Sequence, residues 1–291
     1  MSAADPTLEV DWTGEDATIA EIERELARLR YESSADSPQP NLRTSVMTHI
    51  AWVPQRWKGQ AEETLAGMAE RHPSRTLLLF PAPDEDDGLD ARLSIRCFPV
   101  SDRAVCGEVI ELTLRGERAE APASIVLPLL ISDLPVFCRW RGEPPFGAGP
   151  FEQLVDIVDR LIVDSSEWDE LRYDELGGLF GRTAVSDIAW ARTEDWRREL
   201  AGYWPGIREQ EIRIRGPRAE AELVRGWLNA RLDRAVRPTE PASALAVRLG
   251  GEDVPPPGEE PATPSDLLSA ELDNFARNPI YEAAVLAAAG L

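Results

Sequence analysis

Histidine and cysteine, which carry much of the acid–base and metal chemistry of proteins, are scarce in this chain. Its 291 residues include two histidines, His49 and His72, and three cysteines, Cys97, Cys106 and Cys138. The odd cysteine count and the lack of a Cys-x-x-Cys spacing argue against a disulfide framework and against a zinc site. Each histidine is more simply a packed or capping imidazole than a base, because no nucleophile motif accompanies it. We therefore expect no metal site.

Motifs that hold nucleotides or activate nucleophiles are also missing. The chain has no phosphate loop, no Gly-x-Ser-x-Gly elbow and no His-Glu-x-x-His pair. The nearest approach to a dinucleotide fingerprint is FGAGPF, where Gly147 and Gly149 lack a third glycine and Pro150 follows at once. We expect no cofactor and no catalytic residue, and hence a protein that is not an enzyme.

Basic residues are in deficit. The chain has 31 lysines and arginines against 52 aspartates and glutamates, a formal net charge of −21. Such a charge repels phosphate backbones and anionic lipid surfaces, so neither nucleic acid nor a membrane is an expected partner. No apolar run is long enough to cross a bilayer, and the acidic start MSAADPTLEVDWTGED is unlike a secretory signal. We expect a cytoplasmic protein.

The order of apolar and polar segments predicts an α/β (α+β) chain with two domains, each a mixed β-sheet packed with helices. We expect an N-terminal helix with a polar linker, an N-terminal α/β domain, a C-terminal α/β domain, an acidic proline-rich linker and a C-terminal helical segment, over residues 1–40, 41–150, 151–250, 251–262 and 263–291. Prolines keep the linker extended and unable to pack well.

The N-terminal domain begins with a strand-helix-strand pattern. Residues 44–54 and 74–83 favour strands, and residues 61–72 between them favour a helix. About forty residues is the size of one right-handed crossover unit, so the two strands are expected to be parallel. The polar stretch before them follows an amphipathic helix predicted over 16–30.

The alternating segments 91–100 and 104–116 are typical of a hairpin. A turn at residues 101–102 would place Cys97 opposite Cys106. That arrangement would allow a redox-sensitive pair, although disulfides across two strands are geometrically awkward. The sequence leaves open whether the two thiols are joined.

The stretch SIVLPLLISDLPVFCRWRGEPPF, Ser124–Phe146, has the aliphatic density of a buried strand, yet Pro128 and Pro135 interrupt it. Proline cannot donate to a sheet, so a strand that contains it lies at an edge or is irregular. We expect the body of this strand to sit in the core and its end, residues 139–141, to form a docking edge.

The C-terminal half alternates between helix and strand. Helices are predicted over 150–161, 167–180, 193–204 and 217–232, and strands over 161–166, 185–192, 210–216 and 243–251. A last helix has a marked start, because Thr263 can cap it, Pro264 suits its first turn and Asp266 can reach back to the cap. Pro279 is expected to break this helix.

Tryptophan is the most unusual feature of the composition, with nine residues, several of them beside arginine. Interface centres are rich in tryptophan and arginine, which combine rigid area with directional hydrogen bonds. The alternative for each tryptophan is a core position with its indole N–H satisfied. The candidate partner contacts are Arg139, Trp140, Arg141, Trp190, Arg192, Trp196 and Arg197.

Four segments occur in the order HPSRTLLLFP, SIVLPLLISDLPVFCRWRGEPP, VSDIAWARTEDWRRELAGYW and LLSAELDNFARNPIYEAAV. In this order they resemble the glucose-6-phosphate dehydrogenase assembly protein family, often called OpcA, from about Arg43 to the C-terminus. The resemblance implies a non-catalytic α/β protein that binds the NADP-dependent dehydrogenase of the oxidative pentose phosphate pathway, promotes its oligomerisation and activates it allosterically. Photosynthetic members link activity to thioredoxin through cysteines, an arrangement onto which the three cysteines here do not map.

Two other functions stay open. The chain could be an enzyme on sugar phosphates, with Arg139, Arg141 and Arg192 as phosphate clamps. It could also be a sensor that binds a metabolite and only then its partner. Whether the chain associates with itself is not readable from the sequence.

Overall fold

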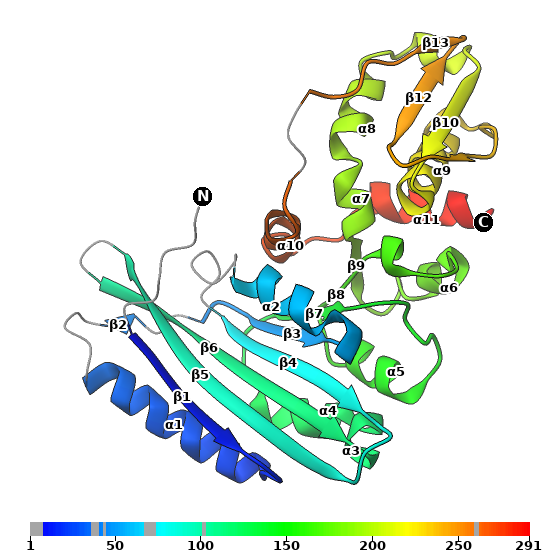
Figure 1. The fold of residues 1–291 in the computed structure, drawn as a ribbon. Helices are drawn as coiled ribbons and strands as arrows, with labels where there is room; N and C mark the ends of the chain where they lie inside the picture. The colour runs from blue at the N-terminus through cyan, green and yellow to red at the C-terminus, as the bar shows by residue number, and fades with distance from the viewer. Residues whose placement is uncertain (1–7, 36–40, 43–44, 67–73, 101–102, 259–261) are drawn as a thin grey trace. The chain divides into compact units, whose positions relative to one another are not determined.

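In the computed structural model the chain folds into two compact units (Figure 1). The structure describes residues 8–35, 41–42, 45–66, 74–100, 103–258 and 262–291. The first unit covers Met1–Leu161 and the second covers Ile162–Leu291, whereas the sequence predicted a domain boundary at residue 150. Helices and two β-sheets make a mixed α/β fold, which confirms the predicted fold class.

The first unit contains a mixed sheet. Its strands are β1 (Leu8–Gly14), β2 (Asn41–Leu42), β3 (Thr48–Trp52), β4 (Arg75–Ala82), β5 (Gly88–Val100), β6 (Arg103–Arg115) and β7 (Val136–Trp140). They lie in the order β1-β5-β6-β4-β3-β7, with β2 beside β6. β3 is parallel to β4, as the crossover predicts, and also to β7. β1 is an edge strand that no apolar run marks, and it was not predicted from the sequence.

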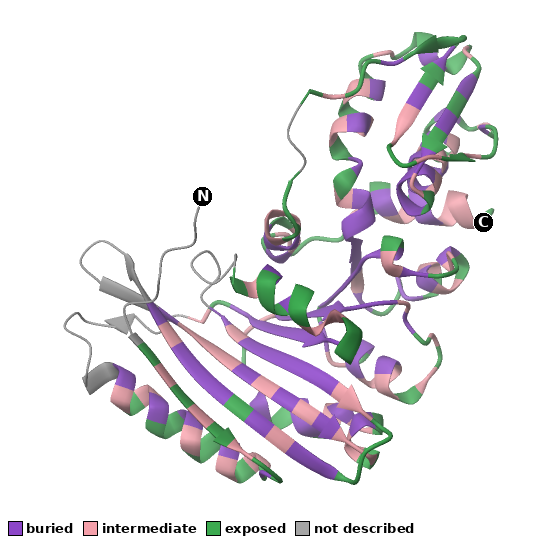
Figure 2. Ribbon diagram, in the orientation of Figure 1, coloured by how far each residue is buried: buried purple, intermediate pink, exposed green. Residues whose placement is uncertain are grey.

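Helices cover this sheet. They are α1 (Ile19–Ala35), α2 (Lys58–Ala66), α3 (Glu117–Glu120), α4 (Pro122–Val126) and α5 (Gly149–Val155), with 3₁₀ turns η1 (Gln55–Trp57) and η2 (Leu127–Leu129). α1 packs on β5 and β1 through Ile22, Leu26 and Leu29, which are buried at helical spacing. Figure 2 shows β4 buried along most of its length. The predicted helix over 61–72 is confirmed as far as Ala66, and its remaining residues lie outside the described part of the chain.

The strand predicted across Ser124–Phe146 is wrong in its first half, which is helical in α4 and η2. Pro122 and Pro128 stand in the first turns of these helices, where the backbone N–H has no intrahelical acceptor and is not missed. β7 begins at Val136, directly after Pro135, and so carries no proline. It pairs with β3 and lies next to β8 (Arg160–Val163), so it is an interior strand and the predicted docking edge is also wrong.

The second unit begins within β8 and alternates helix and strand. Its further strands are β9 (Ala184–Asp187), β10 (Ile212–Gly216), β11 (Glu240–Pro241), β12 (Ala246–Leu249) and β13 (Glu252–Asp253). Its helices are α6 (Tyr173–Gly178), α7 (Ile188–Arg192), α8 (Glu194–Ala201), α9 (Arg218–Leu232), α10 (Pro264–Leu272) and α11 (Pro279–Ala289), with η3 (Ser165–Glu167) and η4 (Gly206–Arg208). β11, β10, β12 and β13 form a second sheet in that order.

Several predictions for the second unit are confirmed and two need correction. Thr263 and Asp266 form the predicted capping box of α10, and Pro279 starts a separate helix. The strand predicted over 185–192 ends at Asp187 and continues as α7, because the Asp187 carboxylate caps that helix. The helix predicted over 167–180 is restricted to α6.

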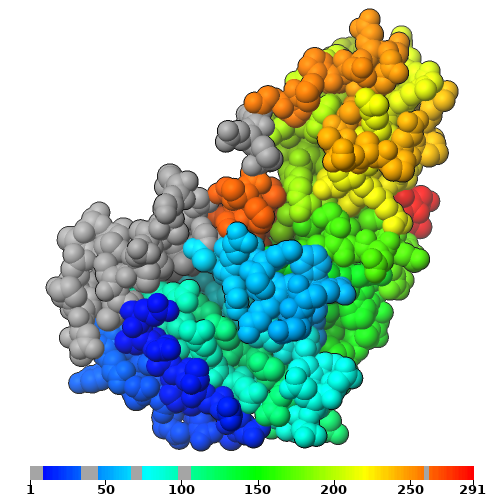
Figure 3. All heavy atoms as spheres, viewed as in Figure 1, coloured from blue at the N-terminus to red at the C-terminus, as the bar shows by residue number. Residues whose placement is uncertain are grey.

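The proline-rich linker lies on the surface of the second unit, in orange in Figure 3, and most of its described residues are exposed. Prolines limit its backbone freedom and its acidic side chains favour water. Within the described ranges, no helix is both long enough and apolar enough to span a bilayer.

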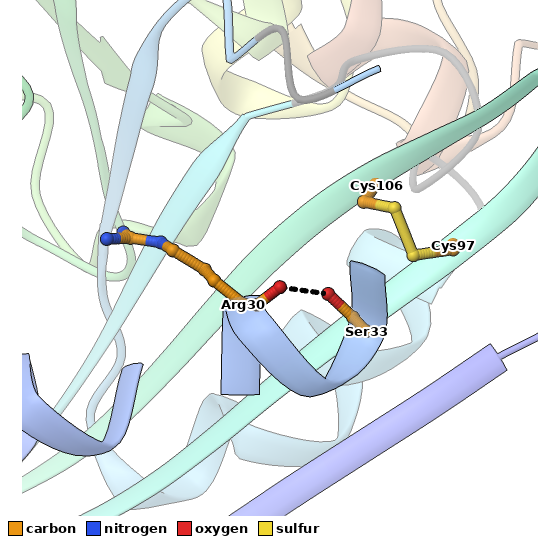
Figure 4. Close-up of a disulfide and its surroundings, with 4 residues drawn as sticks. All are labelled: Arg30, Ser33, Cys97 and Cys106. Atoms are coloured by element: carbon orange, nitrogen blue, oxygen red, sulfur yellow. Dashed lines mark hydrogen bonds between the residues drawn. A yellow bond between two sulfur atoms is a disulfide. The ribbon is translucent and has the colours of Figure 1, made fainter. Parts of the chain in front are cut away.

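The hairpin of the first unit joins its two strands covalently. β5 and β6 are antiparallel, with Cys97 opposite Cys106 as predicted, and their sulfur atoms form a disulfide (Figure 4). Both cysteines are buried beside the last turn of α1, where the Ser33 hydroxyl donates to the Arg30 carbonyl over 3.1 Å. Residues 101–102 lie outside the described part of the chain. The redox sensitivity of the pair stays a prediction.

Candidate interaction site

The aromatic end of β7 packs inside the first unit. Parallel register sets Trp140 beside Trp52 of β3, and the two indoles stack with ring centroids 4.9 Å apart and planes within 8°. Phe151 of α5 meets Trp140 edge-on at 5.0 Å. Aromatic pairs in such geometry add to the stabilisation from burial alone. Trp140 is 3% exposed, so it is a core residue in this structure.

The arginines on either side of Trp140 are buried with it. Arg139 is 2% exposed, and its guanidinium donates to the Trp140 carbonyl. Arg141 is 9% exposed and donates to the Thr64 hydroxyl over 3.1 Å, while its guanidinium lies 5.8 Å from the centre of the Trp57 ring. Arg141 thereby ties α2 and η1 to the end of β7.

Gly142, which completes the Arg-Trp-Arg-Gly segment, has a positive φ of 80°. A Cβ atom there would lie 3.0 Å from an Arg56 guanidinium nitrogen and 3.2 Å from the Trp57 indole nitrogen. Only glycine adopts this backbone conformation without strain and leaves that space open.

Asp187 organises the start of α7 in the second unit. Its Oδ1 accepts from the backbone N–H groups of Ala189 over 2.8 Å and Ser165 over 3.0 Å. The carboxyl is fully buried, and its Oδ2 has no hydrogen-bond partner among the described residues. Burial, followed by the nearby charge of Asp164, raises the pKa of Asp187 to about 7. Asp187 is thus a buried cap whose proton is lost only near neutral pH.

The Arg192 guanidinium forms ion pairs with two carboxylates of the same unit. It forms two hydrogen bonds with the Asp164 carboxylate and one of 3.1 Å with Glu220. The Arg192 side chain is 35% exposed, whereas Asp164 is buried. Because Asp164 precedes η3, Arg192 ends α7 and Glu220 lies in α9, the ion pairs fix three elements to one another.

Trp190, Trp196 and Arg197 lie at the junction of α7 and α8. The Arg197 guanidinium stands 3.5 Å from the centre of the Trp190 ring and donates to the Thr193 hydroxyl over 3.0 Å. Burial lowers the pKa of Arg197 to about 10. Trp190 packs against Tyr281 of α11, and Trp196 belongs to the core of this unit. Both tryptophans are buried.

The seven predicted contact residues therefore fall into two groups that differ in exposure to solvent. Five of them are buried, and direct contact with a partner would require the chain to open there: Arg139, Trp140, Arg141, Trp190 and Trp196. Arg192 and Arg197 are partly exposed and keep their place as candidate contacts. Sequence reasoning missed the residues that hold this set: Trp52, Trp57, Asp164, Asp187 and Glu220. The one sequence signal for these residues was Asp187 at the start of the Asp-x-Ala-Trp-x-Arg segment, because aspartate is a common helix cap.

The described residues hold no cluster of metal ligands: no three His, Cys, Asp or Glu side chains among them are grouped so that they could hold a metal ion. His49 is buried in β3, and His72 lies outside the described residues. The three arginines considered as phosphate clamps are buried or engaged with carboxylates, as above.

Known proteins resemble part of this chain. Residues 66–175 match the family model described as the glucose-6-phosphate dehydrogenase subunit N-terminal domain. Curated proteins named OxPP cycle protein OpcA align with 57% of the chain: that of Nostoc punctiforme is 31% identical over 185 residues, and that of Synechocystis sp. 28% over 182 residues. The alignments cover 39% and 38% of those proteins, so the chain matches less than half of their length. No solved structure matches the chain significantly.

Proposed function

Because this chain is a relative of the OpcA proteins, we propose that it binds glucose-6-phosphate dehydrogenase, promotes the oligomerisation of that enzyme and activates it allosterically, without catalysing a reaction itself. The observation that carries the proposal is the match over residues 66–175, which begins at the last residue of α2 and ends within α6. We place this role in the cytoplasm, in the oxidative pentose phosphate pathway.

The packing of the arginines argues against the alternative function of clamping a sugar phosphate. Arg139 and Arg141 hold the end of β7, and Arg192 neutralises Asp164. These groups are engaged within the chain, which leaves them poorly placed to clamp a phosphate. We propose that partner contacts come from exposed side chains around these cores, with Arg192 and Arg197 among them.

Activation follows from a difference in affinity. A protein that prefers the active assembled dehydrogenase shifts the equilibrium toward that form by the ratio of its two affinities and by nothing else. A preference of about 100-fold is worth about 2.7 kcal/mol.

The decisive experiment is co-purification of this chain with its native dehydrogenase, followed by the velocity against glucose 6-phosphate with and without the chain. We expect a larger dehydrogenase assembly and a lower half-saturation. If the dehydrogenase neither binds the chain nor changes its kinetics at micromolar excess, the proposal is wrong.

The alternative enzyme and sensor functions predict something different. Calorimetry of the isolated chain with glucose 6-phosphate or 6-phosphogluconate should show no heat of binding if the chain is purely an assembly factor. Turnover of either compound by the isolated chain would instead favour an enzyme. Binding without turnover that strengthens association with the dehydrogenase would favour a metabolite sensor.

A further inference from the structure

A groove of about 670 Å³ lies between α8 and α9 in the second unit. We call it the α8–α9 groove. Its lining comes from α8, from the turn and 3₁₀ segment that follow α8, from α9 and from the first turn of α11. Leu200, Ile207, Leu228 and Leu232 are the buried part of the lining, and all four belong to the core of the unit. The groove therefore has a firm apolar floor.

Two large apolar side chains of the lining stay in solvent. Trp204 is 52% exposed and Ile280 is 41% exposed, although most large apolar side chains of the described chain are buried. The half-buried Trp227 lines the groove beside them and packs on the core. Single exposed apolar residues are ordinary on proteins, but a group of them on one concave surface marks an interaction site.

The charge of the groove is opposite to that of the chain. Three arginines and one glutamate line it, in a protein of formal charge −21, and one of the arginines, Arg198, is paired with Glu194 and Asp195 of α8. Arg231 is exposed and has no ion-pair partner within the described residues. Arg208, also exposed, lies 5.4 Å from the centre of the Trp204 ring. Positive charge beside an apolar floor is complementary to apolar side chains flanked by carboxylates.

The backbone around the groove favours one shape of occupant. All of its lining residues lie in helices or in the turn after α8, so they offer no strand edge with which an extended segment could pair. A helix satisfies its backbone groups internally and binds such grooves through side chains spaced three and four residues apart.

We propose that the α8–α9 groove binds an amphipathic helix of glucose-6-phosphate dehydrogenase that carries carboxylates beside its apolar face. This inference rests on the proposed function and adds to it the surface and the chemistry of the contact. Trp204 is the apolar anchor, and Arg231 with Arg208 pairs with the carboxylates of the helix.

The test compares two double variants in their binding to the purified native dehydrogenase. W204A/R231E removes the anchor and reverses one charge of the groove. R24E/Y31A makes the same two kinds of change on α1, where the Arg24 side chain is 66% exposed and Tyr31 is 77% exposed. Truncation of an anchoring tryptophan typically costs at least about 2 kcal/mol, so we expect binding to weaken at least 30-fold in W204A/R231E. The control should stay within about twofold of the unmodified chain.

The outcomes separate this inference from the proposed function. If the unmodified chain does not bind the dehydrogenase, the proposed function itself is wrong. If both variants bind as the unmodified chain does, the function stands and the groove is excluded. A photo-crosslinking residue in place of Trp204 should capture a dehydrogenase helix with neighbouring carboxylates. Capture of a loop, or of a second copy of this chain, would overturn the inference even if W204A/R231E binds weakly. Circular dichroism and the urea midpoint establish that each variant is folded.

Discussion

Trp140 at the end of β7 has arginines as its neighbours in the sequence, and Trp204 in the α8–α9 groove has Arg208 near its ring, but the two sites differ in exposure. Trp140 is 3% exposed between two buried arginines, whereas Trp204 is 52% exposed beneath an exposed Arg208. The residue types are the same and the surroundings differ. β7 has a strand on each side, while Trp204 lies in the turn after α8. A Trp–Arg neighbourhood therefore indicates an interface only where the local topology leaves it uncovered.

The largest expected effect is on the buried site. Trp140→Ala removes an indole that stacks on Trp52, and such truncations in a core cost about 3–5 kcal/mol. Urea unfolding should show this loss in the free energy of unfolding. A loss below about 1 kcal/mol would mean that the end of β7 is not packed as described, and the contrast between the two sites would fail.

Asp187 tests the packing at the start of α7 through the pH dependence of stability. Its pKa is raised from 3.8 to about 7, so the protonated form stabilises the fold fully below the unfolded pKa. That stability is lost as the pH rises through the folded pKa. Relative to Asp187→Asn, which cannot ionise, the unmodified chain should lose roughly 2–4 kcal/mol between about pH 4 and pH 7. Parallel pH profiles of the two proteins would exclude the raised pKa.

The disulfide stabilises the hairpin of the first unit. Cys97 and Cys106 are nine residues apart, and closing a loop of that size stabilises by at most about 3 kcal/mol. A reductant should lower the stability of the unmodified chain and leave C97S/C106S unchanged. Cys138 provides an internal control, because burial raises its pKa to about 12 and should block alkylation until the chain unfolds. Equal sensitivity of both proteins to the reductant would argue against the bond.

The smallest effect is expected at the exposed site. Trp204→Ala should change the free energy of unfolding by less than about 0.5 kcal/mol, because the side chain is half in solvent. The free energy of unfolding should be measured for this variant and for Trp140→Ala under the same conditions, so that the buried and the exposed tryptophan can be compared directly. A loss as large as that of Trp140→Ala would show that Trp204 also belongs to the core.

Sequence patterns predicted helices and strands well where the residues that determine the element lie close together in the chain. The apolar spacing of α1, the alternation in β5 and β6 and the capping box of α10 depend on residues close in sequence. Predictions failed where a distant contact decided the outcome. Residues 188–192 were predicted as a strand, but the ion pair between Arg192 and the distant Asp164 holds them as a helix that the neighbouring Asp187 caps.

Composition, periodicity and motif order are properties of the linear chain, so they were sufficient to predict the α/β alternation, the acidic charge, the facing cysteines and the resemblance to the OpcA proteins. Which Trp–Arg neighbours are covered became visible only in the folded chain. Exposure depends on the strands and helices packed around a residue, and those come from distant parts of the chain. For the same reason, the α8–α9 groove, formed by side chains from three separate segments, has no counterpart in the linear sequence.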